Sequence, residues 1–235
     1  MSELLYEGKA KQVYATEDPN VVMVHYKDDA TAQNGLKKGT IVGKGVINNR
    51  MSNYLFRMLE EKGIPTHYIE ELNDRDTLVK HVQIVPLEVI VRNIAAGSLA
   101  ERLGVSEGTK MDSTVLEFCY KNDELGDPIV NESHIRAIHL ATEEEIRTIT
   151  DLALRINELL KERLSQAHLI LVDFKLEFGR LPDGTIILAD EISPDTCRLW
   201  DDATGEKLDK DRFRRDLGKT EEAYQEVMRR MGLDQ

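Results

Sequence analysis

Leu169-Ile-Leu-Val-Asp-Phe-Lys-Leu-Glu-Phe178 is the stretch that decides the fold. Its charged residues Asp173, Lys175 and Glu177 alternate with apolar ones, and a β-strand places alternate side chains on opposite faces. Pro182-Asp183-Gly184 follows soon after and is typical of a tight turn. The pattern therefore predicts the first strand and the turn of a β-hairpin that has one charged face.

The second strand of this hairpin, Thr185 to Ala189, ends in two carboxylates, Asp190 and Glu191. The turn should bring Asp190 roughly opposite Lys175, to within about one residue. Charges in an otherwise apolar hairpin are costly unless they are paired or bind a metal. A lysine among carboxylates beside a Mg²⁺ position suits phosphate chemistry. A solvated strand face with cross-strand ion pairs would give the same pattern, so the hairpin alone leaves both interpretations open.

Composition narrows the class of protein. The chain has 235 residues and a net charge of −12, which disfavours nucleic acid or an anionic membrane as the main partner. Cys119 and Cys197 lack metal or redox spacing, and the six histidines lack zinc-ligand spacing. No run approaches the roughly 20 apolar residues of a membrane span, and no secretory signal is evident. We expect a cytoplasmic protein with reduced thiols.

The rest of the chain predicts an α+β fold. Residues 4–28 are rich in β-branched and aromatic residues and should be extended. Apolar spacing and end signals predict further elements, which are strands at 77–85 and 87–93, and helices at 46–62, 143–166 and 221–231. Ser98-Leu-Ala-Glu101 looks like a capping box that opens a short helix. Strand-rich sequence gives way to mixed sequence near Val85-Pro86, which predicts lobes of residues 1–85 and 86–235.

Two short segments could bind anions. Gly8-Lys9-Ala10-Lys11 places two cations on a flexible loop that could cover a polyphosphate, although it is not a P-loop and could also be a solvated hairpin. Arg92 should stand at a strand end, and Gly97-Ser98 should lead into a helix N-terminus. Free N–H groups and a guanidinium together make a phosphate or carboxylate site, although a capped helix alone would explain the same residues.

Several longer motifs match one family along nearly the whole chain. They are Tyr6-Glu-Gly-Lys-Ala-Lys11, Val91-Arg-Asn-Ile-Ala-Ala-Gly-Ser-Leu99, Lys121-Asn-Asp123, Asp127-Pro-Ile-Val-Asn-Glu-Ser133, Leu171-Val-Asp-Phe-Lys-Leu-Glu-Phe-Gly179, Asp190-Glu-Ile-Ser-Pro-Asp195, Arg198-Leu-Trp200 and Asp209-Lys-Asp-Arg-Phe-Arg214. In this order they resemble the SAICAR synthetase family of de novo purine biosynthesis, in its bacterial single-function form.

The resemblance implies a fold and a reaction. The fold would be two α+β lobes with ATP in the cleft between them, the N-terminal lobe being similar to that of a protein kinase. The reaction would join L-aspartate to the carboxylate of the carboxylated aminoimidazole ribonucleotide (CAIR), giving SAICAR, ADP and phosphate. Because the oxygen of a carboxylate is a poor leaving group, we expect an acyl phosphate intermediate. The resemblance also implies Mg²⁺ and points to a homodimer, for which the sequence shows no interface.

The resemblance further implies roles for single residues. The ATP site would comprise Lys9, Ala10 and Lys11 over the phosphates, and Val13, Gln83, Ile84 and Val85 near the adenine. The metal ligands would be Glu177 and Asp190. The CAIR site would comprise Arg92, Ser98, Lys175 and Arg198. The catalytic pair would be Lys175, bridging ATP and CAIR, and Asp173, orienting Lys175 or accepting a proton. The aspartate side would comprise Asp127, Lys210, Asp211 and Arg214.

Two other functions fit parts of the sequence. A kinase on a related ATP-binding fold would use the same N-terminal hairpin, but the chain has no H-R-D-x-x-x-x-N loop, and Lys175 stands where a glycine should follow Asp173-Phe174. A non-catalytic nucleotide-binding module would leave the carboxylates and Lys175 without a purpose. The ligase therefore explains the most residues.

Overall fold

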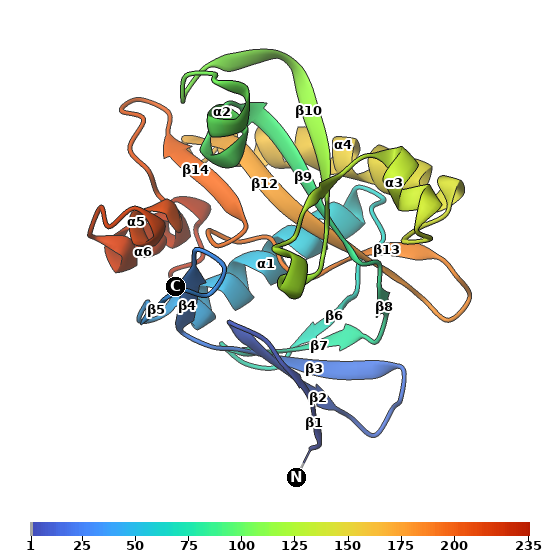
Figure 1. Cartoon of the computed structure of the whole chain (residues 1–235). Coiled ribbons are helices and arrows are strands. Elements are labelled where there is room, and N and C mark those ends of the chain that lie inside the picture. Colours follow the sequence, from blue (N-terminus) through green and yellow to red (C-terminus); the bar gives the residue numbers. More distant parts are fainter. Residues whose placement is uncertain (1) are drawn as a thin grey trace.

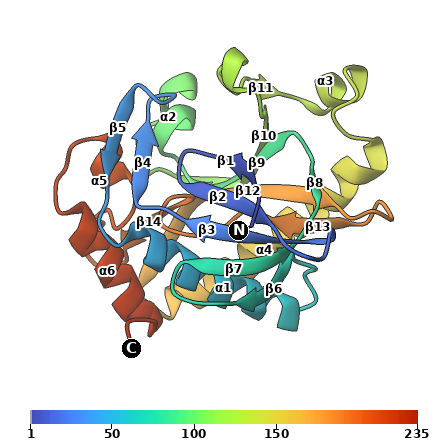
Figure 2. The same cartoon turned by 90° about the horizontal axis from the view of Figure 1, so that it is seen from below.

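The N-terminal part of the computed structural model, which describes residues 2–235, is an antiparallel sheet. Its five strands run in the order β1 (Leu4–Glu7), β2 (Lys11–Ala15), β3 (Val21–Tyr26), β7 (Asp76–Lys80) and β6 (Tyr68–Glu71). Helix α1 (Lys44–Glu61) packs against β3, β6 and β7 (Figure 1). The strands β4 (Asp29–Ala32) and β5 (Lys37–Thr40), which follow β3 and precede α1 in the chain, form a separate hairpin (Figure 2).

A second sheet is organised around one long strand, β12 (Leu169–Arg180). The main path of this sheet contains β11 (Ile129–Val130), β10 (Lys110–Tyr120), β9 (Leu87–Ile94), β12 and β13 (Ile186–Ala189). Two further strands, β8 (Gln83–Ile84) and β14 (Cys197–Asp201), also pair with β12. Strand β12 therefore carries partners along most of both edges.

The helices of the second part cover and connect this sheet. Helix α4 (Glu143–Ser165) packs against β9, β12 and β13 through its apolar stripe. Thr142 and Glu145 form the capping box at its start, and the helix predicted at 143–166 is confirmed. The remaining helices are α2 (Gly97–Leu103), the 3₁₀ turn η1 (Asp123–Leu125), α3 (Glu132–Ala137), α5 (Asp211–Arg214) and α6 (Thr220–Met231).

The predicted hairpin of β12 and β13 is present with the expected register. Glu177 pairs with Ala189, so Asp190 follows the strand end within one residue of the position opposite Lys175. Asp190 has a φ of 56°, and it begins the turn out of the strand instead of belonging to it. Asp173 and Glu177 are only 3% and 4% exposed, so the charged face is not a solvated surface.

One hydrophobic core joins α1 of the N-terminal part to the second sheet and α6, while the buried side chains of β3 and β7 form a separate small cluster. The core includes Met51 and Leu55 of α1, Phe174 and Leu176 of β12, and Tyr224 of α6. Burial of this apolar surface is the main force that holds the two parts together. The lobe boundary at Val85-Pro86 stays a prediction. Nowhere in residues 2–235 does a helix combine the length and apolar character needed to cross a bilayer.

Two local predictions were wrong in detail, and one strand was not predicted at all. The strand expected at 77–85 is divided into β7 and β8. The long strand β10 was not predicted, because Asp112-Ser113 interrupts its apolar pattern and pairing with β9 decides its conformation. Ser98 does not cap α2, since the helix begins at Gly97 after the extended Ala96. The hydroxyl of Ser98 instead accepts a hydrogen bond from Arg92 Nη2 at 3.1 Å.

Candidate active site

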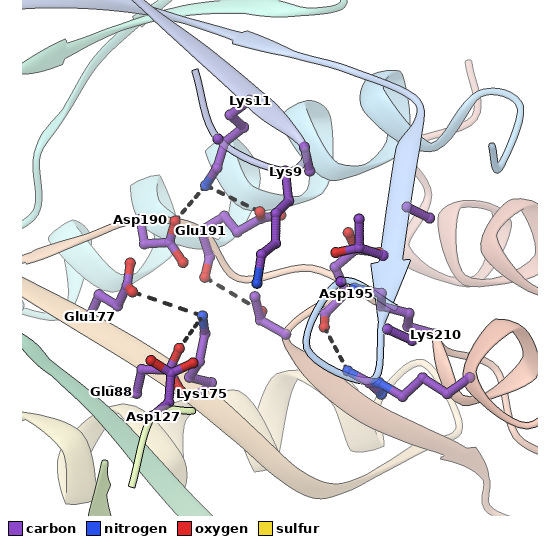
Figure 3. A pocket seen from close by; sticks show the side chains of 18 of the residues that line it. Lys9, Lys11, Glu88, Asp127, Lys175, Glu177, Asp190, Glu191, Asp195 and Lys210 are labelled. Carbon is purple, nitrogen blue, oxygen red and sulfur yellow. Dashed lines mark hydrogen bonds and ion pairs between the residues drawn. The ribbon is translucent and has the colours of Figure 1, made fainter. Parts of the chain in front are cut away.

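A cavity of about 860 Å³ lies where the two sheets face each other. The Gly8–Lys11 turn and the β4–β5 hairpin line it from the N-terminal part. From the second part it is lined by β9, by β12 and by residues 190–198. Figure 3 shows lysines and carboxylates from these segments pointing toward one another. The cavity thus contains the charged face of the hairpin that the sequence singles out.

Lysines form ion pairs with carboxylates at one end of the cavity. This end, here called the phosphate end, comprises Lys11, Lys121, Lys175, Glu177, Asp190 and Glu191. Lys11 Nζ contacts Asp190 Oδ1 and lies 3.1 Å from Glu191 Oε1. Lys175 Nζ lies 3.8 Å from Glu177 Oε1 (Figure 3), and Lys121 Nζ lies 2.9 Å from the same oxygen. Three lysines therefore surround two buried carboxylates, Glu177 and Glu191, and the half-buried Asp190, and all of them line the cavity.

Burial and charge shift the pKa values at the phosphate end in opposite directions. Burial would raise the pKa of Asp190, but the charges of Lys11 and Lys175 hold it below its usual range. Burial and the nearby Asp190 charge raise the pKa of Glu177. Burial opposes the charge of Lys175, yet Glu177 and Asp190 raise its pKa. The mutual repulsion of Glu177 and Asp190 means that an added cation between them would be stabilised.

The donor set suits Mg²⁺ bound together with a ligand. Among residues 2–235, no group of three or more His, Cys, Asp or Glu side chains could hold a metal ion by itself. Glu177 and Asp190 supply two carboxylates, and Mg²⁺ is usually held by one or two carboxylates plus phosphates and water. These residues therefore fit a metal that arrives with a nucleotide.

Two arginines share one carboxylate at the other end of the cavity, here called the arginine clamp (Arg92, Asp173 and Arg198). Arg92 Nη1 donates to Asp173 Oδ2 at 3.0 Å, and Arg198 Nη1 donates to both oxygens at 3.0 and 3.1 Å. Asp173 therefore contacts the two arginines. The sequence had led us to expect that it would orient Lys175 or accept a proton. Burial raises its pKa, while the two guanidinium charges act in the opposite direction. Arg92 Nε also donates to Glu117 Oε2 at 3.0 Å, so carboxylates already pair with both arginines. Guanidinium groups held in this way present donors suited to an anionic ligand.

The clamp continues to α5 through Asp211. Arg198 Nε donates to Asp211 Oδ2 at 2.9 Å, and Arg214 Nη1 donates to Asp211 Oδ1 at 2.8 Å. Arg198, Lys210 and Arg214 line the cavity, whereas Asp211 lies behind them. Burial lowers the pKa of Lys210 to about 8.

Most predicted site residues meet in this cavity. Those that line it are Lys9, Ala10, Lys11, Arg92, Asp127, Asp173, Lys175, Glu177, Asp190, Arg198, Lys210 and Arg214. Those that lie elsewhere are Val13, Gln83, Ile84, Val85, Ser98 and Asp211. Ser98 and Asp211 still contact clamp arginines. The backbone N–H of Val85 donates to Phe178 O at 2.9 Å, so it is already in use.

Sequence reasoning gave no role to several residues that belong to the site. Lys121 begins the Lys121-Asn-Asp123 motif, but its contact with Glu177 depends on the pairing of β10 with β9. Asp195 lines the cavity and accepts from Lys44 Nζ and from Tyr224 Oη. Lys44 is 0% exposed and lies 151 positions from Asp195 in sequence. No local pattern could have revealed such distant partners.

Known proteins match the chain over nearly its whole length. The sequence model of the SAICAR synthetase family matches residues 4–231. The phosphoribosylaminoimidazole-succinocarboxamide synthase of Coprothermobacter proteolyticus is 62% identical over 230 residues, which are 98% of both chains. The crystal structure of the protein of that name from Ehrlichia chaffeensis has a TM-score of 0.96 at 47% identity, covering 98% of this chain and 99% of that one. A SAICAR synthetase in complex with ADP has a TM-score of 0.94 at 47% identity, covering 97% of each chain.

The fold, the cavity and these matches place the chain among the ATP-dependent ligases. It belongs to the SAICAR synthetase family. The family resemblance, the two-lobed α+β fold and the enzyme class predicted from the sequence are thereby confirmed. The chain is a ligase of purine biosynthesis that uses ATP to join L-aspartate to CAIR.

Proposed function

We propose that ligation takes place along β12, with a separate end of the cavity for each charged substrate. The observation that carries this proposal is that Asp173, Lys175 and Glu177 all line the cavity from alternate positions of one strand. Alternate residues of a strand share a face, so the arginine clamp and the phosphate end are held at a set spacing. Lys175 lies between them and can contact both the transferring phosphoryl group and the carboxylate that receives it.

ATP binds with its phosphates at the phosphate end. Lys9 and Lys11 cover the phosphates from the Gly8–Lys11 turn, as a lysine-bearing loop can. Glu177 and Asp190 would hold a Mg²⁺ ion that arrives with the nucleotide, and such an ion would neutralise charge on the phosphate oxygens. The adenine lies toward Val13 and the segment 83–85. The Val85 N–H donates to Phe178 O, and Gln83 and Ile84 pair with β12, so the adenine would use the polar groups of this segment that remain.

CAIR binds at the arginine clamp. Arg92 and Arg198 present guanidinium groups to its ribose phosphate, since such groups bind phosphate in a bidentate manner. Ser98 supports Arg92 through its hydroxyl, which accepts from Nη2. The CAIR carboxylate then points along β12 toward Lys175.

The chemistry follows from this placement. The CAIR carboxylate attacks the terminal phosphorus of ATP, the bond from that phosphorus to the bridging oxygen breaks, and ADP leaves as the acyl phosphate forms. Lys175 neutralises charge on the groups that react. The amine of L-aspartate then attacks the acyl carbon, the C–N bond forms and phosphate leaves. Lys210 and Arg214 bind the carboxylates of L-aspartate, Asp127 contacts its polar groups from the opposite loop, and Asp211 acts through Arg198 and Arg214.

We further propose that the two lobes are residues 1–85 and 86–235, that the protein acts in the cytoplasm and that it forms a homodimer. The segment 83–87 supports the boundary, because the chain leaves the N-terminal sheet there and joins β12 and then β9.

A coupled assay tests the function. Phosphate release and formation of the amide product should require ATP, CAIR and L-aspartate together. A phosphorylated product that accumulates without L-aspartate would indicate a kinase. Nucleotide binding without turnover in any mixture would indicate a binding module.

A further inference from the structure

The guanidinium group of Arg198 packs directly against the backbone of Gly97. Gly97 is the first residue of α2 and has a φ of 53°, in the left-handed region that favours glycine. A Cβ built on Gly97 would lie 2.7 Å from Arg198 Cζ and 2.9 Å from Nη1. Real Cβ atoms essentially never come this close to another heavy atom, so either the guanidinium or the backbone would have to move.

The position of this guanidinium is otherwise closely determined. Its Nη1 donates to both oxygens of Asp173, and its Nε donates to Asp211. Arg92 approaches the same Asp173 from the other side. The spacing between the two guanidinium groups therefore depends on how closely Arg198 can approach the start of α2.

We infer that Gly97 is a positioning residue for substrate binding, because its missing Cβ lets Arg198 close the arginine clamp against α2. This inference rests on the proposed placement of CAIR at the clamp. A methyl group at position 97 would displace the guanidinium at the far end of the Arg198 side chain. The displaced guanidinium no longer matches a phosphate held by Arg92. Binding of the anionic substrate should therefore suffer more than folding does.

The same short helix supplies a matched control. Gly104 caps the C-terminal end of α2 with a φ of 63°, and a Cβ there would meet no atom within 4 Å. Gly97→Ala and Gly104→Ala thus impose the same kind of backbone strain, but only the first collides with Arg198. If backbone strain alone mattered, the two variants would change the KM for CAIR by the same factor.

The primary measurement is the KM of each variant for all three substrates. Gly97→Ala should raise the KM for CAIR by about tenfold to a hundredfold, because small misplacements of binding groups have effects of this size. The KM for ATP should stay within about twofold of the parent, and Gly104→Ala should leave both constants within about twofold. An equal rise for CAIR in both glycine variants, or an unchanged CAIR constant in Gly97→Ala, would overturn the inference.

A double-mutant cycle tests whether the effect passes through Arg198. In an Arg198→Ala background the three atoms nearest to the added Cβ are gone, so adding Gly97→Ala should change the CAIR dissociation constant by less than about twofold. Independent, multiplicative effects would show that Gly97 acts by another route. If Gly97→Ala alone fails to fold, recovery of folding in the double variant supports the inference, and failure of both variants contradicts it.

The outcomes also separate this inference from the proposed function. If the parent makes no SAICAR, the function fails. If the parent makes SAICAR and Arg198→Ala does not weaken CAIR binding, the clamp assignment fails and this inference with it. If Arg198→Ala weakens CAIR binding and Gly97→Ala does not, only the role of Gly97 is wrong.

Discussion

The carboxylate of Asp173 lies between Arg92 and Arg198. A substitution of any one of these three residues therefore changes the hydrogen bonds and the charge of the other two. Removing one arginine leaves the carboxylate with one guanidinium partner in a buried place. A buried carboxylate that loses a partner becomes easier to protonate. Changes at the clamp therefore alter binding and charge together, and controls must separate the two.

Arg92→Ala should weaken CAIR binding by roughly 2–4 kcal/mol, because a charge-assisted contact to a buried anion is lost. Binding of ATP should change little. Arg102→Ala is the matched control, since Arg102 also pairs with Glu117, at 2.7 Å, but is more than a third exposed. Titration calorimetry with CAIR and with ATP would measure both. An unchanged CAIR affinity in Arg92→Ala contradicts the clamp.

Glu177→Gln and Asp190→Asn each remove one anion while keeping size and shape. Each should lower turnover by at least ~10²-fold, because Mg²⁺ no longer stabilises charge on the transferring phosphoryl group. The double variant should be little worse than either single one if both residues hold the same ion. Steady-state kinetics at saturating Mg²⁺ would test this, and near-parental turnover in both single variants would remove the metal assignment.

Lys210 should make L-aspartate binding depend on pH. Its pKa lies near 8, so its positive charge is present below that pH and is lost above it. The KM for L-aspartate should therefore rise between about pH 7 and pH 9, whereas Lys210→Arg, which keeps its charge in this range, should flatten the rise. Lys62→Arg, on the exposed end of α1, serves as the control. A steep rise that persists in Lys210→Arg would assign the pH dependence to another group.

At the scale of elements, the segment between β14 and α5 has its own dependence on pH. Asp209 is fully buried and accepts the backbone N–H groups of Leu199 and Asp211 at 2.8 and 2.7 Å. Burial raises its pKa to about 7, with the Asp211 charge acting in the same direction. An acid with a raised pKa binds its proton more tightly in the folded state, so its contribution to stability is present at low pH and is lost as pH rises toward 7.

Asp209→Asn should remove that contribution. Relative to the parent, the variant should gain stability as pH rises from about 4 to about 7, by at most ~1.4 kcal/mol per pH unit. The exposed substitution Asp112→Asn should show no such trend. Urea unfolding at several pH values would measure the difference, and a stability difference that is constant with pH would show that Asp209 is already ionised in the fold.

The elements that could be predicted are those with strong local signals. Strand β12 alternates charged and apolar residues, and α4 has both a regular apolar stripe and a capping box. Strand β10 lacks such a pattern, and its conformation depends on β9. In the same way, the charges of the site were visible in sequence, but their partners were not. Asp173 was expected to orient Lys175, and only the pairing of β12 with β9 and β14 shows that it lies between two arginines.

At the scale of the whole molecule, the shared core implies that the two parts unfold together. Leu55 of α1 is 0% exposed and belongs to the cluster that also contains β12 and α6. Leu55→Ala should cost about 2–5 kcal/mol and leave a single transition. Far-UV circular dichroism and the fluorescence of Trp200, the one tryptophan, should then give coincident unfolding curves. Separated curves would show that the lobes unfold independently.

Strand β12 also sets where the backbone can open to solvent. Its residues pair with β9 and β14 in one half, and with β13 and β8 in the other. Amide protons in such a strand exchange with deuterium only when the molecule opens globally, whereas those of the Gly8–Lys11 turn exchange through local motion. Deuterium uptake by the turn would thus respond to nucleotide, while β12 would keep its protons with or without ligand. The strand that carries Asp173, Lys175 and Glu177 should therefore exchange most slowly, and the turn that we propose to cover the nucleotide should be among the fastest.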